Sequence, residues 1–351
     1  MPTTWRTLSR GGRSMQTWTE RGLDQIWGAL FPVGTDASWR INVLAVLPHA
    51  QLLAGRIAPG DREAILVKIP PRLIPAGLKL PKGTGFDVMR VAEKELESGE
   101  PMLALVRSPE GANELFSMMA VDVLRHVEAK GNGSSKSLLE AFLSRVADWQ
   151  KFMSADRSKP LSPEKQAGLQ GELEFLKRLM EQMGNAQAAL DTWQGPFKAA
   201  QDFHVGSGAV EIKSTASIRG FRAKINSVEQ LDTNRLPMFL MGVQFVEDPE
   251  GQSLKQLVDY LRKKIGQSGS GKLFEAILFA CRYFDEHAAS YDRPLTVVEL
   301  SCFPVEEDFP CLRRNKLPLQ VTSATYDLDV ATIKTARCTV EEMLEKLGVD
   351  Q

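Results

Sequence analysis

The sequence lacks the cysteine and histidine spacing that zinc sites and disulfide frameworks require. It contains four cysteines, Cys281, Cys302, Cys311 and Cys338, with no C-x-x-C pair, and only four histidines. In a chain of 351 residues, thiols this sparse are typical of buried or incidental cysteines. We therefore expect neither a structural zinc ion nor a disulfide scaffold.

Long apolar runs and an excess of charge of one sign are also missing. No segment approaches the ~20 apolar residues that span a bilayer, and no apolar stretch follows the basic start MPTTWRTLSRGGRSMQTW, as a secretory signal would need. The formal net charge of −1 argues against coating nucleic acid through bulk electrostatics. A local basic groove is enough for an enzyme that contacts a few phosphates. We expect a cytoplasmic protein.

The pattern of apolar residues predicts an α/β (α+β) protein with three parts. Residues 1–155 should form a strand-rich domain with helical ends, because short β-type runs give way to two stretches of helical periodicity. Residues 156–290 should form a core in which a helix precedes a hairpin, further strands and more helices. Residues 291–351 should form a C-terminal α/β extension packed on that core.

The segment Asp202-Phe-His-Val-Gly-Ser-Gly-Ala-Val-Glu-Ile-Lys213 carries the most informative pattern. Its Gly-Ser-Gly turn predicts an antiparallel hairpin. Because side chains alternate along a strand, Glu211 and Lys213 should face one side while Ile212 packs into the core. Asp202, on the other limb of the hairpin, can reach the same edge. Two carboxylates and one ammonium group are therefore expected to converge.

These side chains suit a magnesium site for phosphodiester hydrolysis. Mg²⁺ prefers oxygen ligands, keeps several waters and needs only one or two carboxylates beside substrate phosphate oxygens; Mn²⁺ should substitute for it. The ion activates a water, which Lys213 can position or help to deprotonate. Glu172 adds a third carboxylate from the preceding helix, where Gly168 and Gly171 should let the helix approach the sheet closely.

This constellation resembles the PD-(D/E)XK restriction-endonuclease-like superfamily: a glutamate on the first core helix, an aspartate opening the hairpin and E-x-K on the next strand. Segments along much of the chain are also similar to an uncharacterised PD-(D/E)XK-motif family of bacterial restriction and phage-defence gene clusters. They are Gly171-Glu-Leu173, Trp193-Gln-Gly-Pro196, Gln201-Asp-Phe203, Val210-Glu-Ile-Lys-Ser214, Ser227-Val-Glu-Gln-Leu231, Asp308-Phe-Pro310 and Tyr326-Asp-Leu328. Gln201 stands where the motif has proline, a departure that weakens the motif's name more than its chemistry.

The resemblance implies a restriction-endonuclease-like mixed-sheet core and a Mg²⁺-dependent DNA endonuclease, with RNA not excluded as the substrate. It implies that Asp202, Glu211 and Glu172, together with the backbone carbonyl of Ile212, hold the metal. Gln230 would be an accessory active-site residue. An ATPase, a helicase or a methyltransferase of a defence system is an expected partner, and a homodimer is compatible with this view.

A basic cluster follows the E-x-K strand closely. It comprises Arg219, Arg222 and Lys224, and alternation puts the last two on one face. A charged run of this kind is usually solvated, but beside a metal site that receives a polyanion it is equally suited to contact phosphates.

Other interpretations remain open. Glu211 and Lys213 would also fit an ordinary salt bridge on an exposed hairpin, and the fold would also fit a non-catalytic subunit that binds DNA or a partner protein in a defence complex. The segment Gly266-Gln-Ser-Gly-Ser-Gly-Lys272 resembles a nucleotide-binding loop, but Leu273 replaces the Ser or Thr and a helical segment precedes it, which favours a helix–loop–helix connection. A second E-x-K, Glu128-Ala-Lys130, lies at a predicted helix end, where i and i+2 do not share a face.

Overall fold

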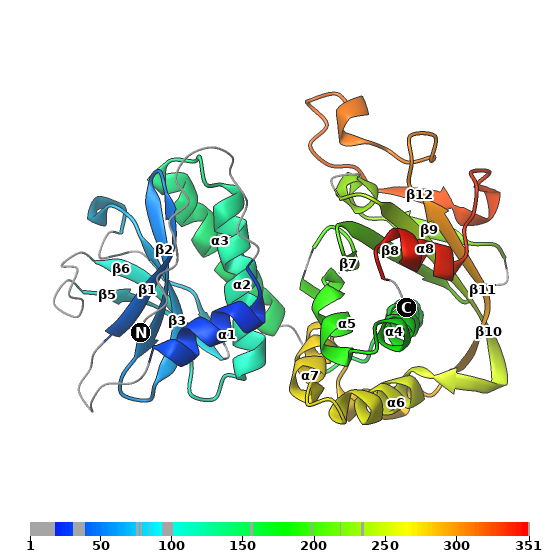
Figure 1. Ribbon diagram of the computed structural model, residues 1–351, viewed down its shortest axis with the longest axis horizontal. Helices are drawn as coiled ribbons and strands as arrows, with labels where there is room; N and C mark the ends of the chain where they lie inside the picture. Colours follow the sequence, from blue (N-terminus) through cyan, green and yellow to red (C-terminus); the bar gives the residue numbers. More distant parts are fainter. Residues whose placement is uncertain are drawn as a thin grey trace. The chain divides into compact units, whose positions relative to one another are not determined.

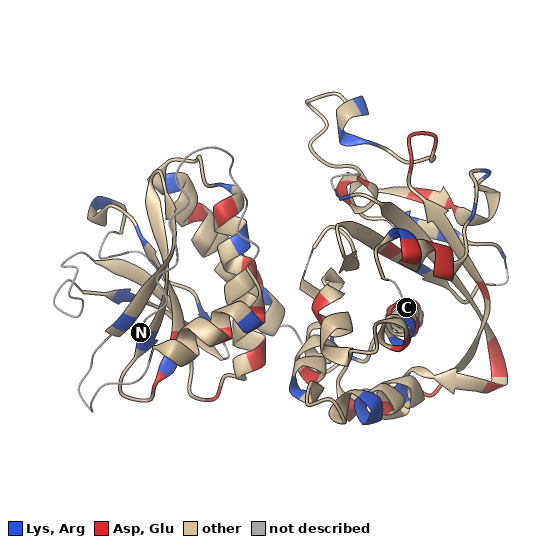
Figure 2. Ribbon diagram, in the orientation of Figure 1, with Lys and Arg blue, Asp and Glu red and all other residues tan. Residues whose placement is uncertain are grey.

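A computed structural model of the chain describes residues 18–30, 39–74, 77, 79–83, 85–92, 101–154, 157–197, 199–217, 219–232 and 235–349. The chain divides into two compact units, Met1–Ala155 and Asp156–Gln351 (Figure 1). Over the described ranges, three sheets and the helices around them make a mixed α/β protein, which confirms the predicted fold class. Charges of both signs are interspersed over each unit (Figure 2). None of the described helices has the length and apolar character needed to cross a bilayer.

The first unit is a six-stranded antiparallel sheet with helices packed against it (Figure 1). The sheet order is β1-β2-β3-β6-β5-β4. The two central strands, β3 and β6, are buried along nearly their whole length, which explains their continuous apolar sequence. The elements are α1 (Glu20–Ala29), β1 (Trp39–Leu47), β2 (Ala50–Ile57), β3 (Arg62–Lys68), β4 (Lys82–Gly83), β5 (Phe86–Val91), β6 (Met102–Arg107), α2 (Asn113–Ala129) and α3 (Ser135–Met153).

The second unit is built on a mixed four-stranded sheet of order β11-β10-β8-β7. The strand β8 runs parallel to β10 and antiparallel to β7, and β11 pairs antiparallel with β10. The elements are α4 (Pro163–Met183), α5 (Ala186–Thr192), β7 (Phe203–Val205), β8 (Gly208–Thr215), β9 (Arg222–Ile225), the 3-10 turn η4 (Val228–Leu231), β10 (Met238–Ser253), α6 (Leu254–Gly266), α7 (Gly271–Ala280), β11 (Pro294–Pro304), β12 (Tyr326–Asp329) and α8 (Val340–Lys346).

Two different layers cover the faces of this four-stranded sheet. The long helix α4 packs against β8 on one face. On the other face, the two-stranded sheet of β9 and β12 contributes Ala223, Ile225 and Leu328 to a buried apolar cluster with Leu240 of β10 and Phe303 of β11. The strand β8 is therefore held between a helix and a second sheet.

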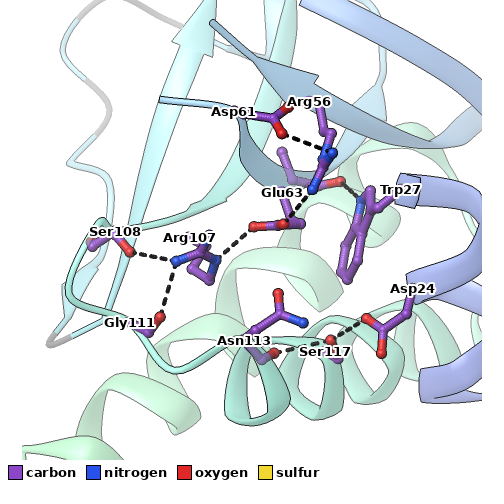
Figure 3. Close-up of polar contacts among 11 residues, drawn as sticks. Asp24, Trp27, Arg56, Asp61, Glu63, Arg107, Ser108, Gly111, Asn113 and Ser117 are labelled. Carbon is purple, nitrogen blue, oxygen red and sulfur yellow. Dashed lines mark hydrogen bonds and ion pairs between the residues drawn. The ribbon is translucent and has the colours of Figure 1, made fainter. Parts of the chain in front are cut away.

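The first unit contains an ion network centred on Glu63, a residue of β3 (Figure 3). The Glu63 carboxylate accepts hydrogen bonds from Arg56 at 2.8 Å and from Arg107 at 2.6 Å, and its side chain is 9% exposed. Burial alone would raise the pKa of this carboxyl, but the two guanidinium hydrogen bonds outweigh burial and hold its pKa below the ordinary value. Each arginine comes from a strand adjacent to β3, so the network ties three strands together.

We expect Glu63→Gln to destabilise the first unit at pH 7, because it removes the carboxylate partner of the largely buried Arg107 and one of the two carboxylate partners of Arg56, which also pairs with Asp61 at 2.9 Å. The loss should be about 3 kcal/mol, the usual result of breaking a buried ion pair. Hydrogen–deuterium exchange on the intact chain should show faster exchange in β2, β3 and β6. The stabilisation is present above the unfolded carboxyl pKa and is lost as pH falls through the lowered folded pKa, so the two proteins should converge only in acid.

Glu140→Gln is the matched control, because Glu140 forms an exposed pair with Lys136 in which the two side chains are 67% and 74% exposed. Exposed pairs of this kind contribute only about 0–1 kcal/mol. Equal exchange in the Glu63 and Glu140 variants would contradict a stabilising role for the Glu63 network.

Candidate active site

The predicted hairpin is present as β7 and β8, joined at Gly206 and Ser207. Gly206 has a φ of 55°, in the left-handed region that glycine adopts without strain. The strand carries Glu211 completely buried at 0% exposure, Ile212 buried at 6%, and Lys213 with its side chain 14% exposed. The salt bridge of the alternative interpretation is present, between Nζ of Lys213 and Oε1 of Glu211 at 2.6 Å, but the pair is buried and not exposed on the hairpin.

Helix α4 begins at Pro163 after a Ser162 cap and ends before Gly184, as its sequence predicts. Gly171 is the point of close approach to β8: a Cβ built there would lie 1.9 Å from Oγ of Ser214. Gly168, one turn earlier, has no heavy atom within 4 Å of such a Cβ. Of the two glycines, Gly171 is therefore the one whose missing side chain lets α4 pack on the strand.

One cavity of about 820 Å³ collects most of the predicted site residues. Its lining combines residues of α4, β8, β9 and η4 with Asp202 and Arg293. Arg222 and Lys224 also line this cavity, whereas Arg219 does not. The predicted site residues that it brings together are Glu172, Asp202, Glu211, Ile212, Lys213 and Gln230.

Glu211 lies at the centre of the hydrogen bonds in this cavity. Its Oε1 accepts from Nζ of Lys213 and from Nε2 of Gln230, both at 2.6 Å. Gln230 is itself held by the backbone N–H of Asn226, which donates to its Oε1 at 2.7 Å. Asp202 is oriented separately, because its Oδ2 accepts from the backbone N–H of Ile212 at 2.7 Å.

The second oxygen of Glu211, Oε2, is buried and has no hydrogen-bond partner. A buried carboxylate oxygen without a partner is energetically unfavourable, since burial removes its hydration and nothing replaces it. A cation with empty coordination positions would supply the missing partner. This oxygen therefore points to a ligand that the polypeptide does not provide.

The titration behaviour of the three carboxyl groups supports the same conclusion. Burial, and then the nearby charge of Asp202, raises the pKa of Glu172 to about 8. Burial also raises the pKa of Asp202, and burial followed by the charge of Asp202 raises the pKa of Glu211 well above its usual range. Burial alone would lower the pKa of Lys213, but the charges of Glu211 and Asp202 outweigh it and raise the pKa. One ammonium group does not compensate three clustered carboxyls.

The donor set fits a hard divalent cation that retains water. Among the described residues, no three His, Cys, Asp or Glu side chains form a ready-made metal cluster. An ion held by Asp202 and Glu211 would therefore complete its coordination with other oxygens, such as the predicted Ile212 carbonyl, water and substrate. Mg²⁺ is bound in this way, through one or two carboxylates together with several waters and phosphate oxygens.

Sequence reasoning missed several residues of the site. Trp193 is fully buried, and its indole Nε1–H donates to Oε2 of Glu172 at 2.7 Å. Lys165 and Arg293 line the cavity as well. Arg293 lies about 80 residues beyond the E-x-K strand, so no local pattern could link it to the site. Trp193, by contrast, stands within the segment Trp193-Gln-Gly-Pro196, which carries part of the family resemblance.

The two other motifs lie away from this cavity's lining. Glu128 is near the end of α2 and accepts a hydrogen bond from Nε1 of Trp18, while Lys130 caps that helix. The segment Gly266–Lys272 forms the turn between α6 and α7 and the start of α7, so a helix precedes it where a nucleotide-binding loop needs a strand. The helix–loop–helix interpretation is confirmed.

Comparison with known proteins places the chain in a family. Residues 4–331 match the family described as "Putative PD-(D/E)XK family member, (DUF4420)". Since this match covers nearly the whole chain, the protein belongs to that family, as the site motifs predicted. No curated protein and no solved structure matches the chain.

We expect Gly171→Ala to destabilise the second unit, because the new methyl group would force α4 away from Ser214 and β8. Overpacking of this kind typically costs about 1–3 kcal/mol. Gly168→Ala, on the same helix, should instead be neutral or stabilising by up to about 1 kcal/mol through helix propensity. Thermal unfolding of the two variants measures the difference. Equal midpoints would contradict the close approach of α4 and β8.

Proposed function

We propose that the protein is a Mg²⁺-dependent endonuclease that hydrolyses phosphodiester bonds in DNA. The observation that supports this most directly is the buried Glu211, whose Oε1 is held by Lys213 and Gln230 while Oε2 has no partner. Membership of a PD-(D/E)XK family agrees with a nuclease. The proposal names the ion, the substrate and the residue roles, which family membership alone does not supply.

Each residue receives a role that follows from its contacts. Asp202 and Glu211 would hold the divalent ion together with the Ile212 carbonyl, and the bound ion would activate a water and offset charge in the transition state. Glu172 would contact a water on that ion. Lys213 would donate hydrogen bonds to the attacking water or a phosphate oxygen. The charges of Glu211 and Asp202 raise the pKa of Lys213 and so favour its protonated, hydrogen-bond-donating form.

Basic side chains at the cavity would contact the phosphate backbone. Arg222 and Lys224 are exposed on β9 and line the cavity. On the neighbouring strand, Asp329 and Asp327 are their cross-strand partners, so part of this positive charge is offset. Lys165 and Arg293 add positive charge elsewhere on the lining, although Arg293 also pairs with Glu247, and they complete the proposed phosphate contacts with Arg222 and Lys224.

The biological setting also belongs to the proposal. A nuclease of this kind would serve bacterial restriction or phage defence, alongside an ATPase, a helicase or a methyltransferase. The competing function is a non-catalytic subunit that uses the same fold to bind DNA or a partner protein. The two functions differ in whether Lys213 and a divalent ion are needed after DNA has bound.

Lys213→Ala should reduce nicking of supercoiled plasmid in Mg²⁺ or Mn²⁺ by on the order of 100-fold or more, because the transition state loses a buried charged donor. Lys130→Ala is the matched control, since it alters the lysine of the other E-x-K at the end of α2. It should cleave like the unaltered protein. Parallel assays with RNA in place of plasmid determine whether DNA or RNA is the substrate.

The non-catalytic subunit would be identified by two results together. The protein would bind DNA without a metal, equally well in both lysine variants, and it would nick no substrate. Activity that survives Lys213→Ala would show that the cleavage arises elsewhere.

Mn²⁺ should raise the thermal stability of the protein, by about 2.7 kcal/mol at a concentration 100 times its dissociation constant. Glu211→Gln should abolish this gain, because it removes the anionic oxygen proposed to bind the ion. Glu181→Gln, an exposed position on α4, should retain the gain. A gain that persists in the Glu211 variant would place the metal at another site.

A further inference from the structure

The indole of Trp193 is a fixed hydrogen-bond donor aimed at the candidate active site. Trp193 is 0% exposed, and its Nε1–H donates to Oε2 of Glu172 at 2.7 Å. Its ring stacks on Phe203 with centroids 5.8 Å apart and planes within 4°, and Phe203 in turn meets Phe175 edge-on at 4.8 Å. Because packing fixes the ring, the direction of the N–H bond is fixed as well.

The two residues after Trp193 fix the backbone of Asp202, the second carboxylate residue that this segment contacts. The backbone N–H groups of Gln194 and Gly195 both donate to the carbonyl oxygen of Asp202, at 2.7 and 2.9 Å. Trp193 itself forms an antiparallel bridge with Phe203. Gly195 leaves no room for a side chain, since a Cβ there would lie 2.6 Å from Oδ1 of Asp202.

The segment Trp193–Gly195 therefore contacts two carboxylate residues from different elements, Glu172 of α4 and Asp202 at the start of β7. An indole N–H is a donor only and occupies one lone pair of a carboxylate. The carboxylate keeps the capacity to accept a hydrogen bond from a metal-bound water. Groups that orient metal-site carboxylates in this way typically change metal affinity or activity by about 10–100-fold when they are removed.

We propose that Trp193 is a positioning residue of the nuclease site. Its indole N–H fixes the position of the Glu172 carboxylate relative to Asp202. This inference rests on the proposed function, because it assigns Glu172 a role beside the divalent ion. Trp193 touches neither ion nor substrate and acts through Glu172. Replacing its N–H should therefore matter only while Glu172 is present.

The test is a double-mutant cycle of Trp193→Phe and Glu172→Ala in the full chain, because alanine leaves the indole N–H no side-chain acceptor at position 172. Trp193→Phe alone should lower kcat for plasmid nicking and weaken Mn²⁺ binding, measured by calorimetry, by about 10–100-fold, with KM for DNA unchanged. In the Glu172→Ala background, the same change should have no further effect on either quantity. Equal losses in both backgrounds would indicate general damage to the core and overturn the proposal, as would unchanged Mn²⁺ binding and kcat in Trp193→Phe.

Trp149→Phe is the matched control. The Trp149 indole is also buried, at 5% exposure, and also donates to a carboxylate, Oδ2 of Asp122, at 2.7 Å, but it lies in the first unit. It should leave kcat and Mn²⁺ binding unchanged. If Trp193→Phe does not fold, β-(3-benzothienyl)alanine at position 193 replaces the N–H with sulfur and preserves the shape of the ring, and the same cycle applies.

The two readouts separate failure of this proposal from failure of the proposed function. If the protein binds Mn²⁺ but cleaves neither DNA nor RNA, the proposed nuclease function is wrong. The double-mutant cycle measured by Mn²⁺ binding still decides the role of Trp193. A protein that binds no Mn²⁺ overturns both. Cleavage and Mn²⁺ binding that are retained in Trp193→Phe overturn only the positioning role.

Discussion

The arrangement of the second unit depends on one unfavourable feature, a glutamate buried completely within a sheet. A carboxylate at the position of Glu211 loses its hydration, and Lys213 and Gln230 replace it at only one of the two oxygens. Asp202 and Glu172 add to the penalty, because each is close enough for its charge to raise the pKa of Glu211. Acidic groups with strongly raised pKa values of this kind cluster at functional sites.

The layers around β8 explain how such a cluster can be built. Strand alternation directs Ile212 toward α4 and Glu211 away from it, toward η4 and Gln230. The glutamate of α4 reaches the cluster from the other side only because the helix lies close to the strand at Gly171. The site therefore needs both faces of the sheet, and neither the helix nor the second sheet would suffice alone.

The sequence was most informative where chemistry and periodicity coincide. The alternation of Glu211, Ile212 and Lys213 around an apolar strand predicted which residues share a face, and the Gly turn predicted the hairpin. Individual strands elsewhere in the chain are harder to recognise. The strand β12, Tyr326–Asp329, has only four residues, and β2, Ala50–Ile57, is largely buried although it contains Gln51 and Arg56. Propensity sets strand boundaries weakly, because cross-strand packing decides them.

The contacts that fix the site were the hardest to predict. A tryptophan in an apolar context is most often a core residue, and Trp193 is one, so nothing in its burial distinguishes it from Trp27, whose indole donates to the backbone carbonyl of Ala64. The difference lies in the acceptor, and the acceptor is set by the meeting of α4 with the chain before β7. Such a contact joins residues 21 positions apart in sequence, and no local pattern encodes it.

The charge on Lys213 constrains the chemistry that this site can perform. A lysine acts as a general base only when its pKa is lowered toward neutrality, as burial in an apolar pocket would do. Here the charges of Glu211 and Asp202 outweigh burial and raise the pKa. Under the proposed function, a bound divalent ion would oppose this effect by neutralising those same carboxylates, so the protonation of Lys213 would be coupled to binding of the ion. The ammonium group of Lys213 would then be released from part of its interaction with Glu211 and Asp202 and could donate to the substrate.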